Sequence, residues 1–242
     1  MTSPLLTEAA PRKDFAGPAL GCILAFVAGY VDVVGFISLF GLFTAHVTGN
    51  FVMIGVDIAG KSTGLLAKLL ALPVFVFAVA ATRLTESRMV REGRRATPPL
   101  LFAEATVLML FRVAAVHASP ISDPSAPAAV GAGMLAVIAM GIQNALSRTS
   151  LADLGPTTIM TGNTTQIVID LVDWQSASET QRNTIHERLK KMVPALAGFA
   201  SGAALGALGY LMLASWCVML PAVLLMALCV LTWRRSANSF QQ

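Results

Sequence analysis

The chain has 242 residues, of which 55% are hydrophobic and 12% are charged, and its mean hydropathy is +0.70. These values exclude an ordinary soluble domain of this length and predict an integral membrane protein. The formal charge of +4 does not indicate nucleic-acid binding, because the cations stand in the segments that flank apolar runs, as in the cytoplasmic loops of membrane proteins.

The chain divides into two predicted membrane repeats. The first covers residues 17–118 and the second covers residues 128–235, and a Pro- and Ser-rich link at 119–127 separates them. Residues 1–16 are polar and contain two prolines, which predicts a flexible cytoplasmic tail. Residues 236–242 form the predicted C-terminal tail.

The first repeat contains apolar runs at 17–40, 65–82 and 99–116. Each has about the 20 residues that a membrane-spanning helix needs. Asp32 lies near the middle of the first run, where a charged side chain costs about 2.5 to 3.5 kcal/mol. Two roles remain open for it: a carrier of a coupling proton, since burial favours a protonated carboxyl, or a hydrogen-bonded structural acid.

The third run contains two ionisable residues, Glu104 and Arg112, eight residues apart. This spacing is about two helical turns, so the two side chains share a face but lie too far apart to pair directly. We therefore expect each to have a partner on another helix. The strongly basic loop before this run contains Arg83, Arg88, Arg91, Arg94 and Arg95.

The second repeat contains apolar runs at 128–146, 192–213 and 216–233, with a hydrophilic loop at 173–191. The runs of the two repeats align in order, and several residues match between them. One internal duplication explains these matches more economically than the general similarity of membrane helices rich in small residues. The matching pairs are Gly29 with Gly141, Asp32 with Asn144, and Pro73 with Pro194.

A polar Thr-Gly-Asn motif interrupts each repeat, at residues 48–50 and at residues 161–163, which are 113 positions apart. We interpret each motif as the start of a short helix that begins at the asparagine and has the threonine as its N-cap. An aspartate follows each motif seven residues later, Asp57 and Asp170. Capping, or solvation at the end of a span, is the ordinary role for such a residue.

The loop charges decide between two topologies. If both motif segments crossed the membrane there would be eight spans, and the arginine-rich loop would face outward, against the positive-inside rule. If each segment is broken or re-entrant, about six spans remain, both termini are cytoplasmic, and Lys61 alone among the loop cations lies outside. Three crossings per half make the second half inverted. The predicted fold is therefore an all-α polytopic membrane protein of inverted 3+3 repeats.

The predicted functional site lies where the two motifs meet. Broken backbone inside hydrocarbon is tolerated only where protein or water surrounds it. Two inverted breaks would meet near the midplane, with the positive ends of their helix dipoles directed at a polar or anionic solute. His46, which has no counterpart in the second half, is expected to be hydrogen-bonded rather than a ligand. The predicted solute site comprises Thr48, Gly49, Asn50, Thr161, Gly162, Asn163, Asp32, Gln143 and Asn144.

A ladder of small residues marks the run at 192–213, where Gly198, Gly202 and Gly206 recur at intervals of four. Such a ladder lets another helix approach closely, either within the monomer or across a homo-oligomer. The sequence contains no Walker loop, dinucleotide fingerprint, metal-ligand cluster or nucleophile elbow. We therefore expect no enzyme, no cofactor and no metal site.

Four segments carry a family resemblance: residues 29–36, 43–50, 141–145 and 161–163. Through them nearly the whole chain resembles the YoaK family of uncharacterised bacterial multi-pass membrane proteins. The resemblance implies about six spans and a bacterial inner membrane, and it brings no established activity. In that family the second motif usually reads Thr-Gly-Thr. Asn163 makes the halves of this chain more alike and leaves open whether the two sites are equivalent.

The leading functional hypothesis is an inner-membrane transporter or channel for a small polar or anionic solute or ion, with its path at the junction of the motifs. Its expected partners are the lipid bilayer and that solute, with no nucleic acid. The alternative is a non-transporting scaffold or assembly protein, in which the same residues only hold helices together. A membrane-embedded enzyme acting on a lipid or quinone is the third and weakest hypothesis.

Overall fold

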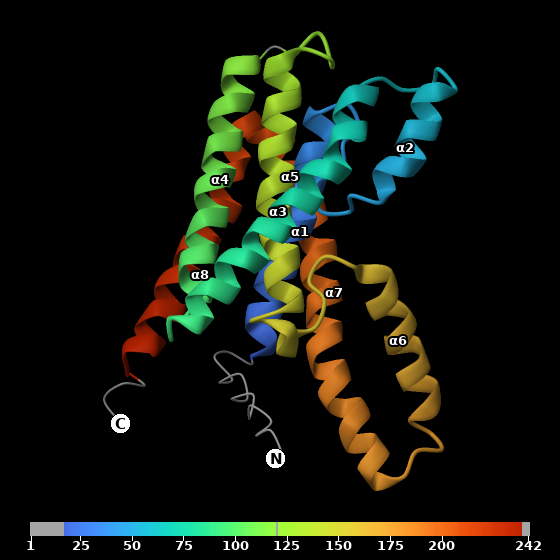
Figure 1. Cartoon of the computed structure of the whole chain (residues 1–242). Coiled ribbons are helices and arrows are strands. Elements are labelled where there is room, and N and C mark those ends of the chain that lie inside the picture. The colour runs from blue at the N-terminus through green and yellow to red at the C-terminus, as the bar shows by residue number, and fades with distance from the viewer. Residues whose placement is uncertain (1–16, 120, 239–242) are drawn as a thin grey trace, which may run out of the picture.

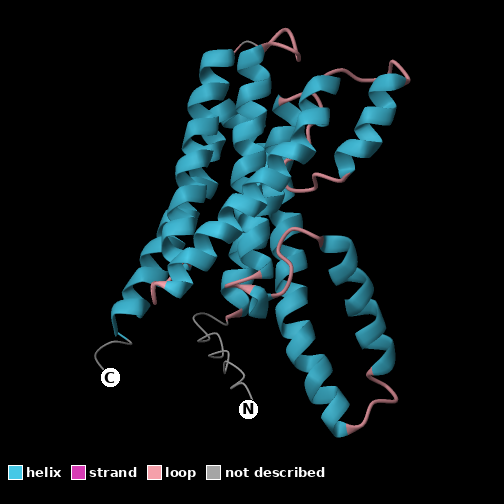
Figure 2. Ribbon diagram, viewed as in Figure 1, coloured by secondary structure: helices cyan, strands magenta, loops and turns pink. Residues whose placement is uncertain are grey.

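The computed structural model describes residues 17–119 and 121–238, and every regular element in these ranges is helical (Figure 2). The predicted tail at 1–16 and the last four residues of the C-terminal tail lie outside the described residues. The α-helices are α1 (Pro18–Ser38), α2 (Gly49–Ile58), α3 (Leu65–Arg91), α4 (Thr97–Ala118), α5 (Pro127–Arg148), α6 (Met160–Asp173), α7 (Glu179–Leu213) and α8 (Met219–Asn238), with 3-10 segments η1 (Ala152–Leu154) and η2 (Ala214–Val218).

Long apolar helices dominate the described chain. Five segments are long and apolar enough to cross a membrane, and the last of them, Glu179–Arg234, contains α7 and most of α8. The segment η2 separates these two helices, and Ala214 at its start has a positive φ of 46° where the chain reverses. The chain is thus a multi-pass, membrane-spanning helical protein, as its composition predicts.

Two long helices extend further than the apolar runs predict. Helix α3 continues to Arg91, so three of the arginines assigned to a loop lie on a helix. Helix α7 begins at Glu179, inside the segment expected to be a hydrophilic loop. A capping box starts it: Ser178 Oγ accepts the backbone N–H of Gln181, and Gln181 Oε1 accepts that of Ser178. Hydropathy marks the apolar part of a helix and not its end.

The bundle is held by four main pairs of helices (Figure 1). Helix α1 packs against α7, helix α3 against α5, and helix α4 against both α5 and α8. The α1–α7 contact is close because a Cβ on Gly198, Gly202 or Gly206 would overlap a backbone carbonyl oxygen of α1. The glycine ladder is therefore covered within one chain, and it is not free to pack against a second copy. A homo-oligomer remains a prediction without an assigned surface.

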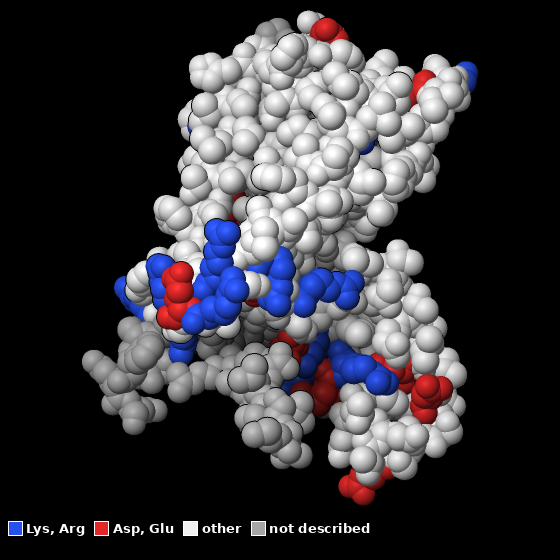
Figure 3. Space-filling model, viewed as in Figure 1, with Lys and Arg blue, Asp and Glu red and all other residues white. Residues whose placement is uncertain are grey.

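The two short helices stand on the same side of the bundle (Figure 1). Helix α2 begins near half the height of the bundle and runs toward the end where α4 finishes, packing against α3. Helix α6 also begins near half height but runs the opposite way, packing against α7. The outline of the molecule is indented between these two helices (Figure 3). The starts of α2 and α6 thus face this notch from opposite sides.

Positive charge gathers at one end of the bundle, which we call the basic end (Figure 3). Helix α1 begins there and α3, α5 and α8 finish there (Figure 1). At the opposite end, Lys61 stands in the link between α2 and α3. The described cations near the basic end are Arg83, Arg88, Arg91, Arg94, Arg95, Arg148, Arg182, Arg188, Lys190, Lys191 and Arg234.

Candidate functional site

Asp32 anchors the loop that leads into α2. Its side chain is buried on α1, and its Oδ1 atom accepts the backbone N–H groups of Thr44 at 2.7 Å and Ala45 at 2.8 Å. Hydrogen bonds to a charged acceptor are stronger than those between neutral groups, and a buried N–H group without a partner is costly. The geometry therefore supports the structural role for Asp32 among the two that the sequence leaves open.

His46 completes this anchor. Its Nδ1 atom lies 3.2 Å from Asp32 Oδ2, and its ring meets the edge of Phe199 with the ring centroids 5.4 Å apart. The hydrogen bond to the Asp32 carboxylate raises the pKa of the His46 imidazole above its usual value. His46 is thus hydrogen-bonded, and it ties the loop both to α1 and to α7.

The asparagine of each motif fastens its own loop. Asn50 Nδ2 donates to the carbonyl oxygen of Phe43 at 2.8 Å, and Asn50 Oδ1 accepts the Phe43 N–H at 2.9 Å. Asn163 Nδ2 donates in the same way to the carbonyl oxygen of Pro156 at 2.9 Å. Both bonds reach back seven residues. Because proline has no N–H group, the second half keeps only one of the two bonds.

The threonines do not act as the predicted N-caps. Thr48 is the N-cap residue of α2, but its side chain makes no capping hydrogen bond. Thr161 lies inside the first turn of α6, whose N-cap residue is Ile159. At α2 the first N–H groups are already used, since Gly49 N donates to His46 O at 2.7 Å. Helix α6 begins directly after Ile159, whose backbone is extended. Within the described residues, its first N–H groups therefore make no turn hydrogen bonds like those at the start of α2.

Two amides of α5 hold the loop before α6. Gln143 Nε2 donates to Leu24 O at 2.7 Å and to Thr157 Oγ1 at 3.2 Å, while Gln143 Oε1 is buried without a hydrogen-bond partner in the described chain. Asn144 Oδ1 accepts the hydroxyl of Thr158 at 2.6 Å. These threonines, which belong to the polar stretch of the second motif, were missing from the predicted site residues.

The predicted site residues therefore form two clusters, one around each loop. Asp32 and Asn50 belong to the first cluster, and Asn163, Gln143 and Asn144 belong to the second. Their side chains are mostly buried and engaged with backbone. Among the residues of the two motifs, Thr48, Thr161 and Gly162 are exposed and Gly49 is half-buried.

The sequence predicts that Asp57 and Asp170 cap a helix or are solvated at the ends of spans. Instead, each forms an ion pair with the long helix that follows it. Lys68 Nζ lies 2.8 Å from Asp57 Oδ1, and the Lys68 side chain is fully buried. Arg188 Nη2 lies 2.5 Å from Asp170 Oδ1. A buried charge needs such a partner, so these pairs lock α2 to α3 and α6 to α7. Lys68 is missing from the predicted site residues, and a lysine inside an apolar run was the signal that could have indicated a buried acidic partner.

The Asp170–Arg188 pair predicts a pH-dependent stability. The hydrogen bonds from Arg188 hold the pKa of Asp170 below its usual value. A carboxyl with a lowered folded-state pKa stabilises the fold fully above its unfolded pKa of about 3.9, and this contribution is lost as the pH falls through the folded-state pKa. Asp170→Asn is therefore expected to lower the free energy of unfolding by about 2 kcal/mol at pH 7 and by much less near pH 3.

Unfolding of the detergent-solubilised protein at both pH values measures this difference. The exposed Asp153 provides a matched variant, Asp153→Asn, which should change stability little at either pH. A penalty for Asp170→Asn that stays constant between pH 7 and pH 3 contradicts the charged pairing.

Within the described residues, Glu104 lacks the partner on another helix that the sequence predicts, whereas Arg112 has one. Glu104 is completely buried, and neither of its carboxyl oxygens has a hydrogen-bond partner in the described chain. Arg112 instead stacks on Trp216 of η2, with its guanidinium carbon 3.6 Å from the ring centroid. This cation–π contact gives the arginine an aromatic partner, which a search for opposite charges cannot identify.

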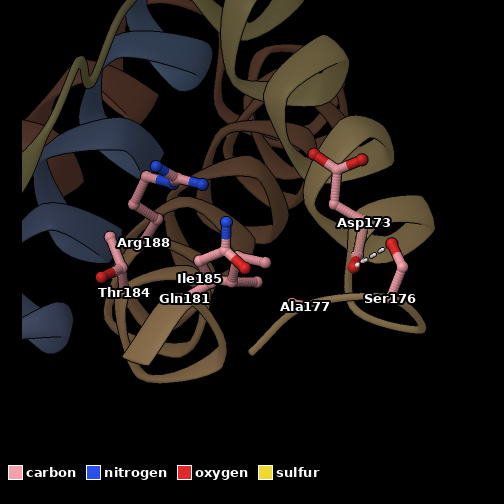
Figure 4. Close-up of a pocket in the computed structure, with 7 residues that line it drawn as sticks. All are labelled: Asp173, Ser176, Ala177, Gln181, Thr184, Ile185 and Arg188. Carbon is pink, nitrogen blue, oxygen red and sulfur yellow. Dashed lines mark hydrogen bonds between the residues drawn. The ribbon is translucent and has the colours of Figure 1, made fainter. Parts of the chain in front are cut away.

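Two hollows of the described surface lie away from the motifs. One, of about 450 Å³, lies in the turn between α6 and α7 and is lined by Asp173, Ser176, Gln181 and Arg188 among others (Figure 4). The other, of about 460 Å³, lies between α4 and α8. Within the described ranges, no group of three or more His, Cys, Asp or Glu residues is arranged to hold a metal ion.

Comparison with known proteins places the chain in a family. Residues 20–231 match a family described as protein of unknown function, DUF1275. No curated protein and no solved structure matches the chain. The match covers the region from α1 to α8, which includes both motif loops and both ion pairs. The chain therefore belongs to the DUF1275 family of proteins of unknown function.

Proposed function

We propose that this protein is a transporter or channel of the bacterial inner membrane for a small polar or anionic solute, built from two inverted repeats. The observation that carries the proposal is the placement of α2 and α6. Both begin near half the height of the bundle and run toward opposite ends (Figure 1). Half-helices that enter from opposite faces and start at the midplane are how many transporters build their solute sites.

Equivalent contacts in the two halves support the duplication. The asparagine bonds to Phe43 and Pro156 match, and each aspartate pairs with a cation of the next long helix. A Cβ on Gly29 would meet α7 at Phe199, and one on Gly141 would meet α3 at Ala78. Phe199 lies five positions after Pro194 in α7, and Ala78 lies five positions after Pro73 in α3.

The packing of the long helices supports the inversion. Exchanging the two halves converts the α1–α7 pair into the α5–α3 pair and the α2–α3 pair into the α6–α7 pair, and all of these pairs are in contact. Helices α1 and α5 run in opposite directions (Figure 1). Each half has three long helices, and an odd number of crossings makes the second half begin on the opposite side of the membrane from the first.

The distribution of cations supports the orientation. Arginine and lysine residues flank spans on the cytoplasmic side of membrane proteins. In the proposed orientation the basic end faces the cytoplasm (Figure 3). Lys61, in the link between α2 and α3, faces the other side. Helix α1 begins and α8 finishes at the basic end, which supports the proposal of two cytoplasmic termini.

The solute path in this proposal runs through the notch between the starts of α2 and α6. The start of α6 presents Thr161 and Gly162 to the surface and carries the positive end of the helix dipole. First-turn N–H groups have no partner within their own helix, so they are available to a polar or anionic solute. Thr48 at the start of α2 adds a hydroxyl. Asp32, Asn50, Asn163 and Asn144 support the path by holding the two loops.

A scaffold role is the second candidate function, and one observation favours it. Asp32, Asn50 and Asn163 all hydrogen-bond to loop backbone, which is also what residues that only hold helices together would do. A membrane-embedded enzyme has no comparable support. A measurement of solute flux across the membrane distinguishes a transporter from a scaffold.

Osmotic swelling of proteoliposomes in glycerol, formate, acetate and lactate measures this flux. The transport proposal expects at least one of these solutes to enter faster than in protein-free liposomes. Thr161→Val should slow that entry about tenfold, because it removes one hydrogen-bonding group from the path. Thr165→Val, one turn further along α6 and also exposed, should leave entry unchanged. Equal rates with and without protein in all four solutes contradict transport of this class and favour the scaffold.

A further inference from the structure

The surface between α4 and α8 contains an apolar groove of about 460 Å³ at the basic end, which we call the α4–α8 groove. The first turns of α4 form one wall, and the last turns of α8 form the other. Six of its lining side chains are apolar or weakly polar, and the remaining one is an arginine. The groove is lined by Pro99, Phe102, Met226, Cys229, Val230, Trp233 and Arg234.

Packing beneath the groove fixes its shape. Cys229 Sγ lies 3.2 Å from the carbonyl oxygen of Pro98, so α8 and the start of α4 are joined directly at its floor. Leu225 and Leu228 are buried against the core. The walls, in contrast, are open: Phe102 is 50% exposed and Trp233 is 63% exposed. The groove therefore has a packed floor and open walls, so it is preformed and accessible to lipid.

The charged side chain that lines the groove is a cation. Arg234 is the charged residue among the lining side chains, and the described lining contains no acidic residue. The link between α3 and α4 adds Arg94 and Arg95 just before Pro99 in the chain. Arg94 pairs with the exposed Glu92 at 3.3 Å, whereas Arg234 lines the groove itself.

We propose that the α4–α8 groove binds an anionic phospholipid of the cytoplasmic leaflet. One acyl chain lies along Phe102, Met226 and Val230, and the phosphate group contacts Arg234 at the basic end. Trp233 occupies the position of an interfacial aromatic residue, where its ring meets the glycerol region. Basic pockets between spanning helices on the cytoplasmic side are the usual sites for anionic head groups.

Retention of lipid by the full-length protein, measured by native mass spectrometry from detergent micelles, tests this site. The probes are palmitoyl-oleoyl phosphatidylglycerol, which is anionic, and palmitoyl-oleoyl phosphatidylcholine, which is not. The wild-type protein is expected to retain the anionic lipid preferentially. Arg234→Gln should reduce that preference about fivefold, the effect expected for one cation near an anionic head group.

Two matched variants make the result decisive. Arg91→Gln removes an exposed cation at the same end that does not line the groove, and it should leave the preference unchanged. Val230→Trp fills the groove while keeping every cation, and it should abolish retention of the anionic lipid. Equal retention of the two lipids, an Arg91→Gln effect as large as that of Arg234→Gln, or full retention by Val230→Trp each overturns the proposal.

Discussion

Replacing Asp32 with alanine is expected to lower the free energy of unfolding by about 3 kcal/mol, because two buried N–H groups lose a charged acceptor. These groups belong to Thr44 and Ala45, which donate to one carboxylate oxygen at 2.7 and 2.8 Å. The loop that they hold leads directly into α2. Denaturation of the purified protein in detergent micelles measures the loss.

Asp32→Asn is the matched variant for this prediction, because the amide keeps one acceptor oxygen and removes only the charge. It is expected to cost about 1 kcal/mol, the scale of one neutral hydrogen bond. An Asp32→Asn penalty equal to that of Asp32→Ala contradicts the role of the carboxylate oxygen as a loop anchor. Solute entry retained in Asp32→Asn proteoliposomes further separates the anchor from a proton carrier.

Replacing Gly202 with alanine is the second substitution with a large expected effect. A Cβ at this position overlaps the backbone carbonyl oxygen of Phe26 on α1, and backbone cannot move aside as a flexible side chain can. The two helices must separate, at a cost of about 3 kcal/mol, the upper part of the range for overpacking. Thermal unfolding of the purified protein should show a correspondingly lower midpoint.

Gly55→Ala is the control for this effect, since a Cβ on Gly55 of α2 meets nothing within 4 Å. Alanine favours a helix over glycine, so Gly55→Ala should be neutral or stabilising by up to about 1 kcal/mol. A Gly202→Ala protein as stable as wild type contradicts the close α1–α7 contact.

The length of the apolar runs predicted which segments form membrane-spanning helices, but not where these helices end. The run predicted at 65–82 is the apolar part of α3, which continues for nine residues to Arg91 because its cationic end suits the membrane surface. For α7, the local signal was present in the sequence: Ser178 and Gln181, which lie fourteen and eleven residues before the start of the apolar run at Met192, form a capping box.

The motif residues stand out in the sequence by their repetition, but their hydrogen-bond partners depend on the tertiary fold. Asn50 and Asn163 bind backbone seven residues earlier, which no helical or strand periodicity indicates. Lys68 inside an apolar run required a buried anion, yet several acids were available in the sequence. Likewise, the glycine ladder predicted a close helix contact, and only the folded chain identifies α1 as the helix in contact.

In the proposed inverted repeat, α2 and α6 enter the membrane from opposite faces. Single cysteines at Lys61 and Ser176, which follow these two helices, test it most directly when labelled in intact cells with a membrane-impermeant maleimide. The native cysteines, Cys22, Cys217 and Cys229, are first replaced with alanine. The inverted repeat predicts that Lys61→Cys is labelled from outside and Ser176→Cys only after the membrane is permeabilised. Labelling of both cysteines from the same face, as eight full crossings require, contradicts the inverted repeat.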